Sequence, residues 1–194
     1  MLAKSAPRGR SRIGAGVWRL QLLAMVACAT QQGTSIAPSE IVLESQGRYS
    51  LLLMTSGWTR ITGSTKDELE SDLILSNAKA GVTVFVNVHP QAEQSIDSVV
   101  FGRRKILAQN NEILSSEEER SFLERSDFVP VSVVRYRMRG KQASAWFPLI
   151  VGTARGPDSI VEVLAIGGHP TQLDGLFEDV LSGLRIPAAS GAAP

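Results

Sequence analysis

Residues 128–152 read FVPVSVVRYRMRGKQASAWFPLIVG, and this stretch decides the fold. Two long runs rich in apolar residues flank the polar segment 139–141. Tyr136 and Trp146 lie on either side of that segment, and aromatic and β-branched residues favour strands. The stretch therefore predicts an antiparallel hairpin with its turn at 139–141.

Further strands are expected on both sides of this hairpin. The clearest is the segment 82–89, in which four valines alternate with Thr, Phe, Asn and His, a period of two. Shorter apolar runs predict strands at 49–54, 58–61, 72–76 and 160–166. Because short connections join neighbouring strands, the sheet is expected to be largely antiparallel, in an α+β fold.

Three helices complete the predicted order of elements. The first covers about 95–109. The second begins near Ser115 and Ser116, since each serine has a glutamate three residues later, the spacing of a capping box, and the acidic run 117–119 suits a helix amino terminus. The third begins near Thr171 and must cover a sheet face, because its apolar residues form one stripe: Leu173, Leu176, Phe177, Val180, Leu181 and Leu184.

Composition and charge fit one globular domain with extra residues at its ends. Of the 194 residues, 43% are hydrophobic and 20% are charged, which is enough apolar material for one core. Residues 1–39 hold five basic side chains and no acid, whereas the rest of the chain holds 15 basic and 19 acidic ones, a net charge of −4. An acidic body does not favour nucleic-acid phosphates, so no nucleic-acid partner is expected.

The amino terminus has the layout of a secretory signal. Its basic segment is followed by the apolar run 20–28, far shorter than the roughly 20 residues of a membrane-spanning helix. The run ends in MVAC, which resembles the lipobox of bacterial lipoproteins, although leucine is usual where Met25 stands. The resemblance implies a signal peptide over 1–28, lipidation of Cys28 by acyl chains such as palmitate, a membrane anchor, and, from Ala29, delivery to the outer membrane.

Other interpretations of the leader stay open. Ala27-Cys28-Ala29 also fits a small-x-small cleavage site, which would release a soluble exported protein without Cys28. An acid-free leader with arginines also fits an organellar transit peptide, and Cys28 could simply be a small residue of the apolar run. The predicted location is the cell envelope, facing the periplasm, with secretion or an organelle lumen as alternatives.

Polar segments separate the folded body from both ends of the chain. The segment 29–40 contains Gly and Pro and predicts a flexible tether. Residues 188–194 predict a disordered tail. The folded domain is therefore expected over 41–187, and the single cysteine excludes an intramolecular disulfide.

The beginning of the body is similar to a known group of domains. A YSLLL run at 49–53 leads into Ser56-Gly57-Trp58, and this resembles the opening of PsbP-like domains, although Thr55 and Ser56 stand where proline is common. The order of later elements continues the resemblance over about 41–187. The group includes the extrinsic photosystem II protein PsbP, a Ran-binding nuclear import factor, and lipoproteins of the DcrB and LpqN types.

The resemblance implies an antiparallel sheet sandwiched by helices, an α/β/α arrangement. It also implies a non-enzymatic domain that binds a protein partner or assists assembly, although the known partners do not carry over because no partner-specific residues match. The expected function is a cell-envelope lipoprotein acting as a protein-binding or assembly module. A soluble exported or organelle-imported extrinsic subunit, and an enzyme with an unrecognised site, are the alternatives.

Three arginines form the candidate binding surface. Arg135, Arg137 and Arg139 alternate along the first strand of the hairpin, so their side chains share one face. Exposed, they would meet acidic partners or anionic headgroups. In the alternative interpretation, acids from neighbouring strands neutralise them.

Residue patterns typical of catalysis or metal binding are sparse. His89 ends the valine strand on the side opposite the valines, and His169 lies in a Gly-Gly-His-Pro turn, without the spacing of metal ligands. The sequence contains neither a G-x-S-x-G elbow nor a P-loop. We therefore expect no catalytic residue, no metal and no cofactor. Trp58 and Trp146 are expected in the core or at its edge.

Overall fold

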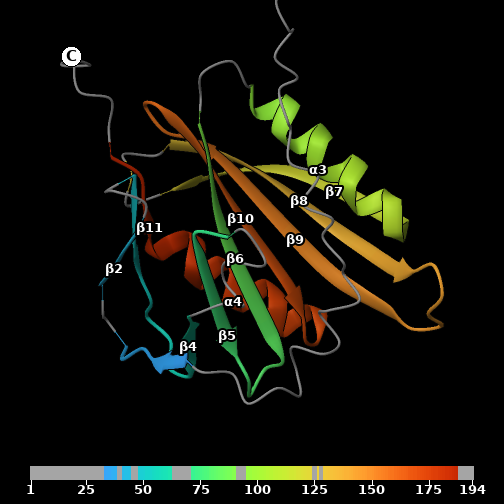
Figure 1. The fold of residues 1–194 in the computed structure, drawn as a ribbon, viewed down its shortest axis with the longest axis horizontal. Helices are drawn as coiled ribbons and strands as arrows, with labels where there is room; N and C mark the ends of the chain where they lie inside the picture. Colours follow the sequence, from blue (N-terminus) through green and yellow to red (C-terminus); the bar gives the residue numbers. More distant parts are fainter. Residues whose placement is uncertain are drawn as a thin grey trace, which may run out of the picture.

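The structure is a computed structural model that describes residues 33–38, 41–44, 48–62, 71–90, 95–123, 126 and 129–187. Its main feature is one large antiparallel sheet. Its eight described strands follow the order β1-β4-β5-β6-β10-β9-β8-β7, and every neighbouring pair is antiparallel (Figure 1). The strands are β1 Gly33–Ser35, β4 Trp58–Ile61, β5 Leu73–Asn77, β6 Val82–Pro90, β7 Asn111–Leu123, β8 Val129–Gly140, β9 Trp146–Arg155 and β10 Ser159–Gly167.

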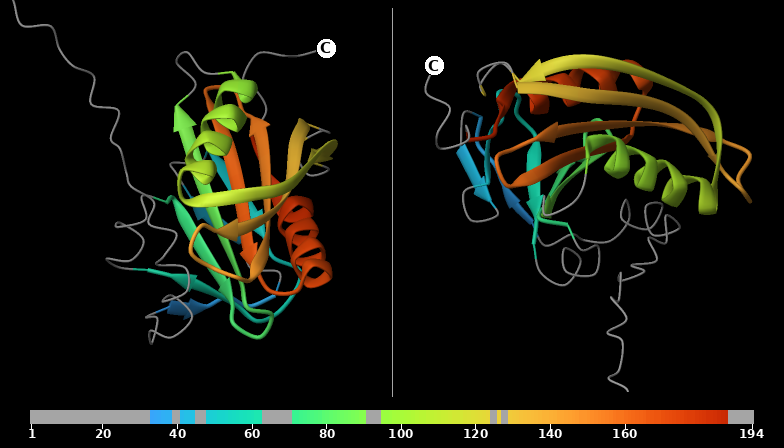
Figure 2. Two further views of the ribbon diagram at one scale, coloured as in Figure 1. Left: turned by 90° about the vertical axis from the view of Figure 1, so that its right-hand side faces the viewer. Right: turned by 90° about the horizontal axis from the view of Figure 1, so that it is seen from above.

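A helix covers each face of this sheet. Helix α3 spans Ile96–Asn110 and begins at Ser95, whose side-chain oxygen accepts a hydrogen bond from the Ser98 N–H at 3.1 Å. Helix α4 spans Pro170–Gly183, with its proline in the first turn, where the missing N–H costs nothing. Figure 2 shows the two helices on opposite sides of the sheet.

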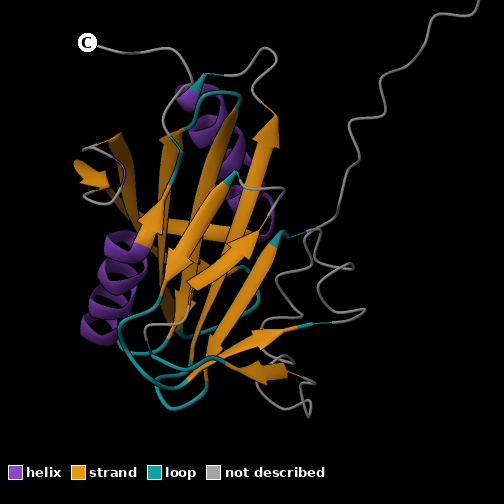
Figure 3. Ribbon diagram, turned by 90° about the vertical axis from the view of Figure 1, so that its left-hand side faces the viewer, coloured by secondary structure: helices purple, strands orange, loops and turns teal. Residues whose placement is uncertain are grey.

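A smaller sheet shares the α4 side. It has the order β11-β3-β2, with bounds β2 Ile41–Glu44, β3 Tyr49–Leu52 and β11 Leu184–Arg185. The predicted antiparallel sheet with helices is thus confirmed. Strands dominate the fold, however (Figure 3), and the two faces are covered unequally, so the three-layer description fits only in part.

Hydrophobic side chains fill both sides of the large sheet. The stripe predicted for the last helix is buried, since five of its members are at most 3% exposed: Leu173, Phe177, Val180, Leu181 and Leu184. These residues pack on valines of β6, β8 and β10 and on the small sheet. On the other side, Leu107 of α3 packs in a second cluster that includes Phe85, Tyr136 and Met138.

The Gly-Trp segment ties the small sheet to α4. Gly57 has φ 92°, a left-handed conformation that glycine adopts without steric cost. The turn directs Trp58 into the core, where it is fully buried. Trp58 Nε1 donates to Thr55 Oγ1 at 3.0 Å, and the Thr55 hydroxyl donates to Asp179 Oδ2 of α4 at 2.7 Å. Thr55 therefore links this turn to the helix.

The predicted hairpin is confirmed as β8 and β9. The two strands pair from Val131 opposite Ala154 to Arg139 opposite Trp146. The connection runs over 141–145, a little later than predicted, because strand pairing continues through Gly140.

The helix predicted near Ser115 and Ser116 is wrong. Residues 111–123 form β7, which pairs with β8 along its length. A capping box favours a helix by only about 1 kcal/mol. Pairing with β8 instead satisfies a long backbone ladder and sets Glu112 opposite Arg139 and Glu117 opposite Arg135.

The predicted tether is too long. Gly33–Ser35, inside the expected segment 29–40, forms β1 against β4, and Ile36 is 5% exposed in the core. A polar composition did not reveal these residues because three strand residues at a sheet edge need little apolar surface. The expected signal peptide 1–28 and tail 188–194 lie outside the described residues.

Candidate functional site

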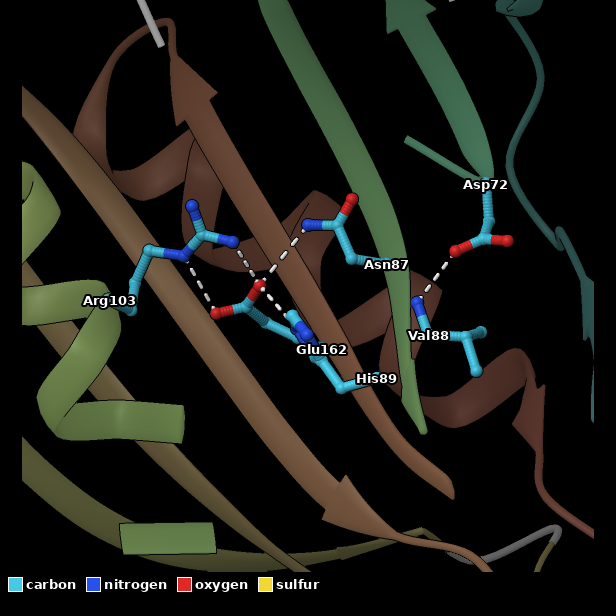
Figure 4. A network of polar contacts seen from close by, with 6 residues as sticks. All are labelled: Asp72, Asn87, Val88, His89, Arg103 and Glu162. Atoms are coloured by element: carbon cyan, nitrogen blue, oxygen red, sulfur yellow. Dashed lines mark hydrogen bonds and ion pairs between the residues drawn. The ribbon is translucent and has the colours of Figure 1, made fainter. Parts of the chain in front are cut away.

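A buried polar cluster lies between α3 and the large sheet (Figure 4). Glu162 of β10 is fully buried at its centre. Asn87 reaches it from the neighbouring strand β6, His89 from the end of β6, and Arg103 from α3. Residues from three elements therefore converge on one carboxylate.

Each contact that the described residues make to this carboxylate comes from a nitrogen. Glu162 Oε1 accepts a hydrogen bond from Arg103 Nε at 2.8 Å. Its Oε2 accepts from Arg103 Nη2, from Asn87 Nδ2 at 3.1 Å, and lies 3.3 Å from His89 Nε2. The two bonds from Arg103 make a bidentate pair, the strongest geometry for these groups.

Opposing effects set the charge state of this pair. Burial alone raises the pKa of Glu162, but hydrogen bonds from His89 and Arg103, together with their charge, outweigh burial and lower the pKa from 4.5 to about 2. Burial likewise lowers the pKa of Arg103, while bonding to Glu162 raises it overall. Both groups are therefore ionised at neutral pH.

This geometry fastens α3 to the sheet. A carboxylate with a pKa of about 2 is a poor proton acceptor near neutral pH, and nitrogens already occupy both of its oxygens. His89, whose side chain is 30% exposed, is the member that reaches solvent. Within the described residues, the His89 ring contacts Glu162.

The sequence pointed to His89 but not to the rest of this cluster. His89 does lie on the face opposite the core valines of β6, as predicted. The overlooked signal was Glu162 itself, an acid in the middle of the apolar run 160–166, because a buried charge requires a partner. That partner, Arg103, lies 59 positions earlier, and no local pattern connects them.

The two histidines are far apart. His89 pairs with Ile160 at one end of β10, and His169 follows Gly167 at the other end, about 23 Å away at strand spacing. They cannot share a metal ion. Nor do the described residues bring three His, Cys, Asp or Glu side chains together as metal ligands.

The candidate arginines point to the α4 side, and two of them are neutralised. Arg135 contacts Glu119 of β7 at 2.5 Å and, on α4, Asp174 at 3.0 Å and Glu178 at 3.3 Å. Arg139 pairs with Glu112 of β7, with Nε 3.2 Å from Oε2. The predicted alternative, neutralisation by acids of neighbouring elements, holds for these two residues.

Arg137 differs from its neighbours. Its guanidinium carbon lies 4.3 Å from the ring centroid of Trp146, a cation–π contact. Among the described residues, no carboxylate lies within ion-pair distance of Arg137, and its side chain is exposed. Trp146, expected in the core or at its edge, is 42% exposed, because the end of the hairpin projects past α4 (Figure 1). We call Arg137 and Trp146 the hairpin pair.

Cys28, the predicted lipidation site, lies outside the described residues. Within the described part of the chain, no helix has the length and apolar character needed to cross a bilayer.

Comparison with solved structures identifies the fold. The solution structure of cyanobacterial PsbP (CyanoP) from Synechocystis sp. PCC 6803 matches with a TM-score of 0.54 and 10% sequence identity, over 82% of this chain and 99% of that chain. The chain has a PsbP-like fold. The Ran-binding protein Mog1p of Saccharomyces cerevisiae matches with a TM-score of 0.49 and 11% identity, over 82% of this chain and 97% of that chain. No family model and no curated protein sequence matches.

The PsbP-like fold confirms the resemblance drawn from the Gly-Trp opening and the order of elements. At 10% identity the match concerns the fold alone.

Proposed function

We propose that this PsbP-like domain is a non-enzymatic protein-binding or assembly module of the cell envelope, tethered to a membrane through Cys28. One observation carries the binding role: the hairpin pair, in which an arginine without a carboxylate partner lies on a half-exposed tryptophan. The partner it fits is a protein segment with an acidic side chain.

The chemistry of the hairpin pair is that of a binding hot spot. Trp and Arg are the residues most enriched where a few side chains dominate binding energy. Stacking on Trp146 restrains the Arg137 guanidinium, so less rotamer entropy is lost when a carboxylate binds in its plane. Arg135 and Arg139 already form ion pairs within the chain, so a carboxylate of a partner would add less binding energy at these two residues.

The binding role is tested by capturing proteins from native membranes with matched variants. Trp146→Ala and Arg137→Ala should each weaken binding of the specific partner by about 30-fold, the loss typical of a hot spot. Arg139→Ala is the control, because this arginine is also exposed but is paired with Glu112. If the partner binds all three variants as tightly as wild type, the hairpin pair does not contribute to binding.

The tether is supported by the MVAC sequence after a basic leader. Two acyl chains hold a protein stably at a bilayer, since each buried methylene contributes about 0.8 kcal/mol. The test is metabolic labelling with palmitate followed by detergent partitioning. Wild type should carry label and enter the detergent phase, and Cys28→Ser should do neither. If both proteins fractionate alike, the soluble exported or imported form is the correct one.

A further inference from the structure

We infer that the outer surface of α3, formed by Phe101, Arg104 and Lys105, rests on the anionic headgroups of a membrane. This inference deepens the proposed function and rests on its tether at Cys28. It states which face of the body lies against the bilayer.

The chain between the proposed lipid and the folded body is short. Only residues 29–32 separate Cys28 from Gly33, where β1 begins. The five Cα–Cα steps from Cys28 to Gly33 span at most about 18 Å when the chain is fully extended. This reach is shorter than two helix diameters, which are about 10–12 Å each. A lipidated Cys28 would therefore hold some face of the body close to the headgroups.

The charge of each side of the sheet determines which face lies against the headgroups. Helix α4 carries Asp174, Glu178 and Asp179 and no basic residue, so it repels anionic headgroups. Arg135 and Arg139, on the same side of the sheet, are already paired with acids and offset this repulsion little. On α3, Arg104 and Lys105 are exposed, and the acid of this helix is Asp97, in its first turn. Each basic residue near an anionic surface adds attraction, so the body should orient with α3 inward.

Phe101 supplies the apolar part of this surface. It is 71% exposed, the highest value among the large hydrophobic side chains of the described residues. Arg104 and Lys105 follow three and four positions later, one turn along the same side of the helix. An exposed aromatic ring beside basic side chains suits the boundary between headgroups and acyl chains. Buried Arg103, bound to Glu162, fixes the helix with this side outward.

Depth measurements on the acylated protein test the orientation. The protein is reconstituted in vesicles of phosphatidylethanolamine and phosphatidylglycerol, with a fluorescent label on Phe101→Cys and brominated lipids as quenchers. The control label is on Met54→Cys, which is 58% exposed and next to Thr55 on the α4 side. Quenching at position 101 but not at 54 is expected. Equal quenching at both positions, or none at 101, would overturn the inference.

A second measurement separates docking from the tether. Arg104→Gln/Lys105→Gln should weaken co-sedimentation with phosphatidylglycerol vesicles about 30-fold. Lys79→Gln/Arg185→Gln removes the same charge from exposed sites on the β5–β6 turn and on β11, away from α3, and should have little effect. Equal losses in both double variants would contradict docking through α3. If wild-type protein carries no palmitate, the proposed tether is wrong. Co-sedimentation of the processed protein and its double variants then still tests docking through α3.

Discussion

Glu162 couples the stability of the fold to pH. Its pKa falls from 4.5 to about 2 on folding, so between these values the unfolded chain binds a proton that the folded chain does not. The stability it contributes is therefore complete above pH 4.5 and is lost as the pH falls towards 2. The contribution is about 3 kcal/mol, and urea unfolding over this pH range would measure it.

Removing the carboxylate charge should expose the cost of burying Arg103. In Glu162→Gln the guanidinium stays buried without a counter-charge, and we expect a loss of about 3–5 kcal/mol in the free energy of unfolding at neutral pH. The acid dependence should flatten in the same variant. Glu178→Gln, on an exposed partner of Arg135, should change stability by less than about 1 kcal/mol. Equal stabilities of the two variants would show that the buried pair does not anchor α3.

Single residues also mark where sequence patterns stop being informative. The alternation of Arg135, Arg137 and Arg139 correctly predicted a shared face, but not which of the three is free. The neutralising acids come from β7 and α4, which are distant in the chain, so only the folded register distinguishes Arg137 from its neighbours.

At the scale of elements, the end of α4 packs closely on the backbone of β3. A methyl group on Gly183 would stand 1.8 Å from the Leu52 carbonyl oxygen, whereas one on Gly175, in the same helix, meets nothing within 4 Å. Gly175→Ala should therefore stabilise the protein by up to about 1 kcal/mol through helix propensity. Gly183→Ala should lower the melting temperature, because backbone must move. Thermal unfolding of both variants checks this, and stabilisation by both would contradict the packing of α4 on β3.

The elements that could be predicted are those whose own side chains decide their structure. The hairpin, the valine strand and the stripe of α4 carry their periodicity in sequence, and all three are confirmed. Strand β7 carries a helix-like pattern, but it pairs with β8, which sets Glu112 opposite Arg139 and Glu117 opposite Arg135, and this pairing cannot be seen in the local sequence. Strand β1 is too short to show a sequence pattern, and it forms because it pairs with β4.

At the scale of the whole molecule, the two helices divide the surface by charge. The α4 side bears acids and the hairpin pair, while the outer surface of α3 bears bases and Phe101. A protein held close to an anionic bilayer with α3 inward would present the hairpin pair away from the membrane. The two proposals are therefore geometrically compatible, since they use opposite sides of one sheet (Figure 2).

Photo-crosslinking in the native membrane tests this division most directly. A photoreactive amino acid is placed at Trp146 in one variant and at Phe101 in another, both exposed positions on opposite sides of the sheet. We expect a discrete protein adduct from position 146 and lipid adducts from position 101. Lipid adducts from 146, or the same protein adduct from both positions, would contradict this division.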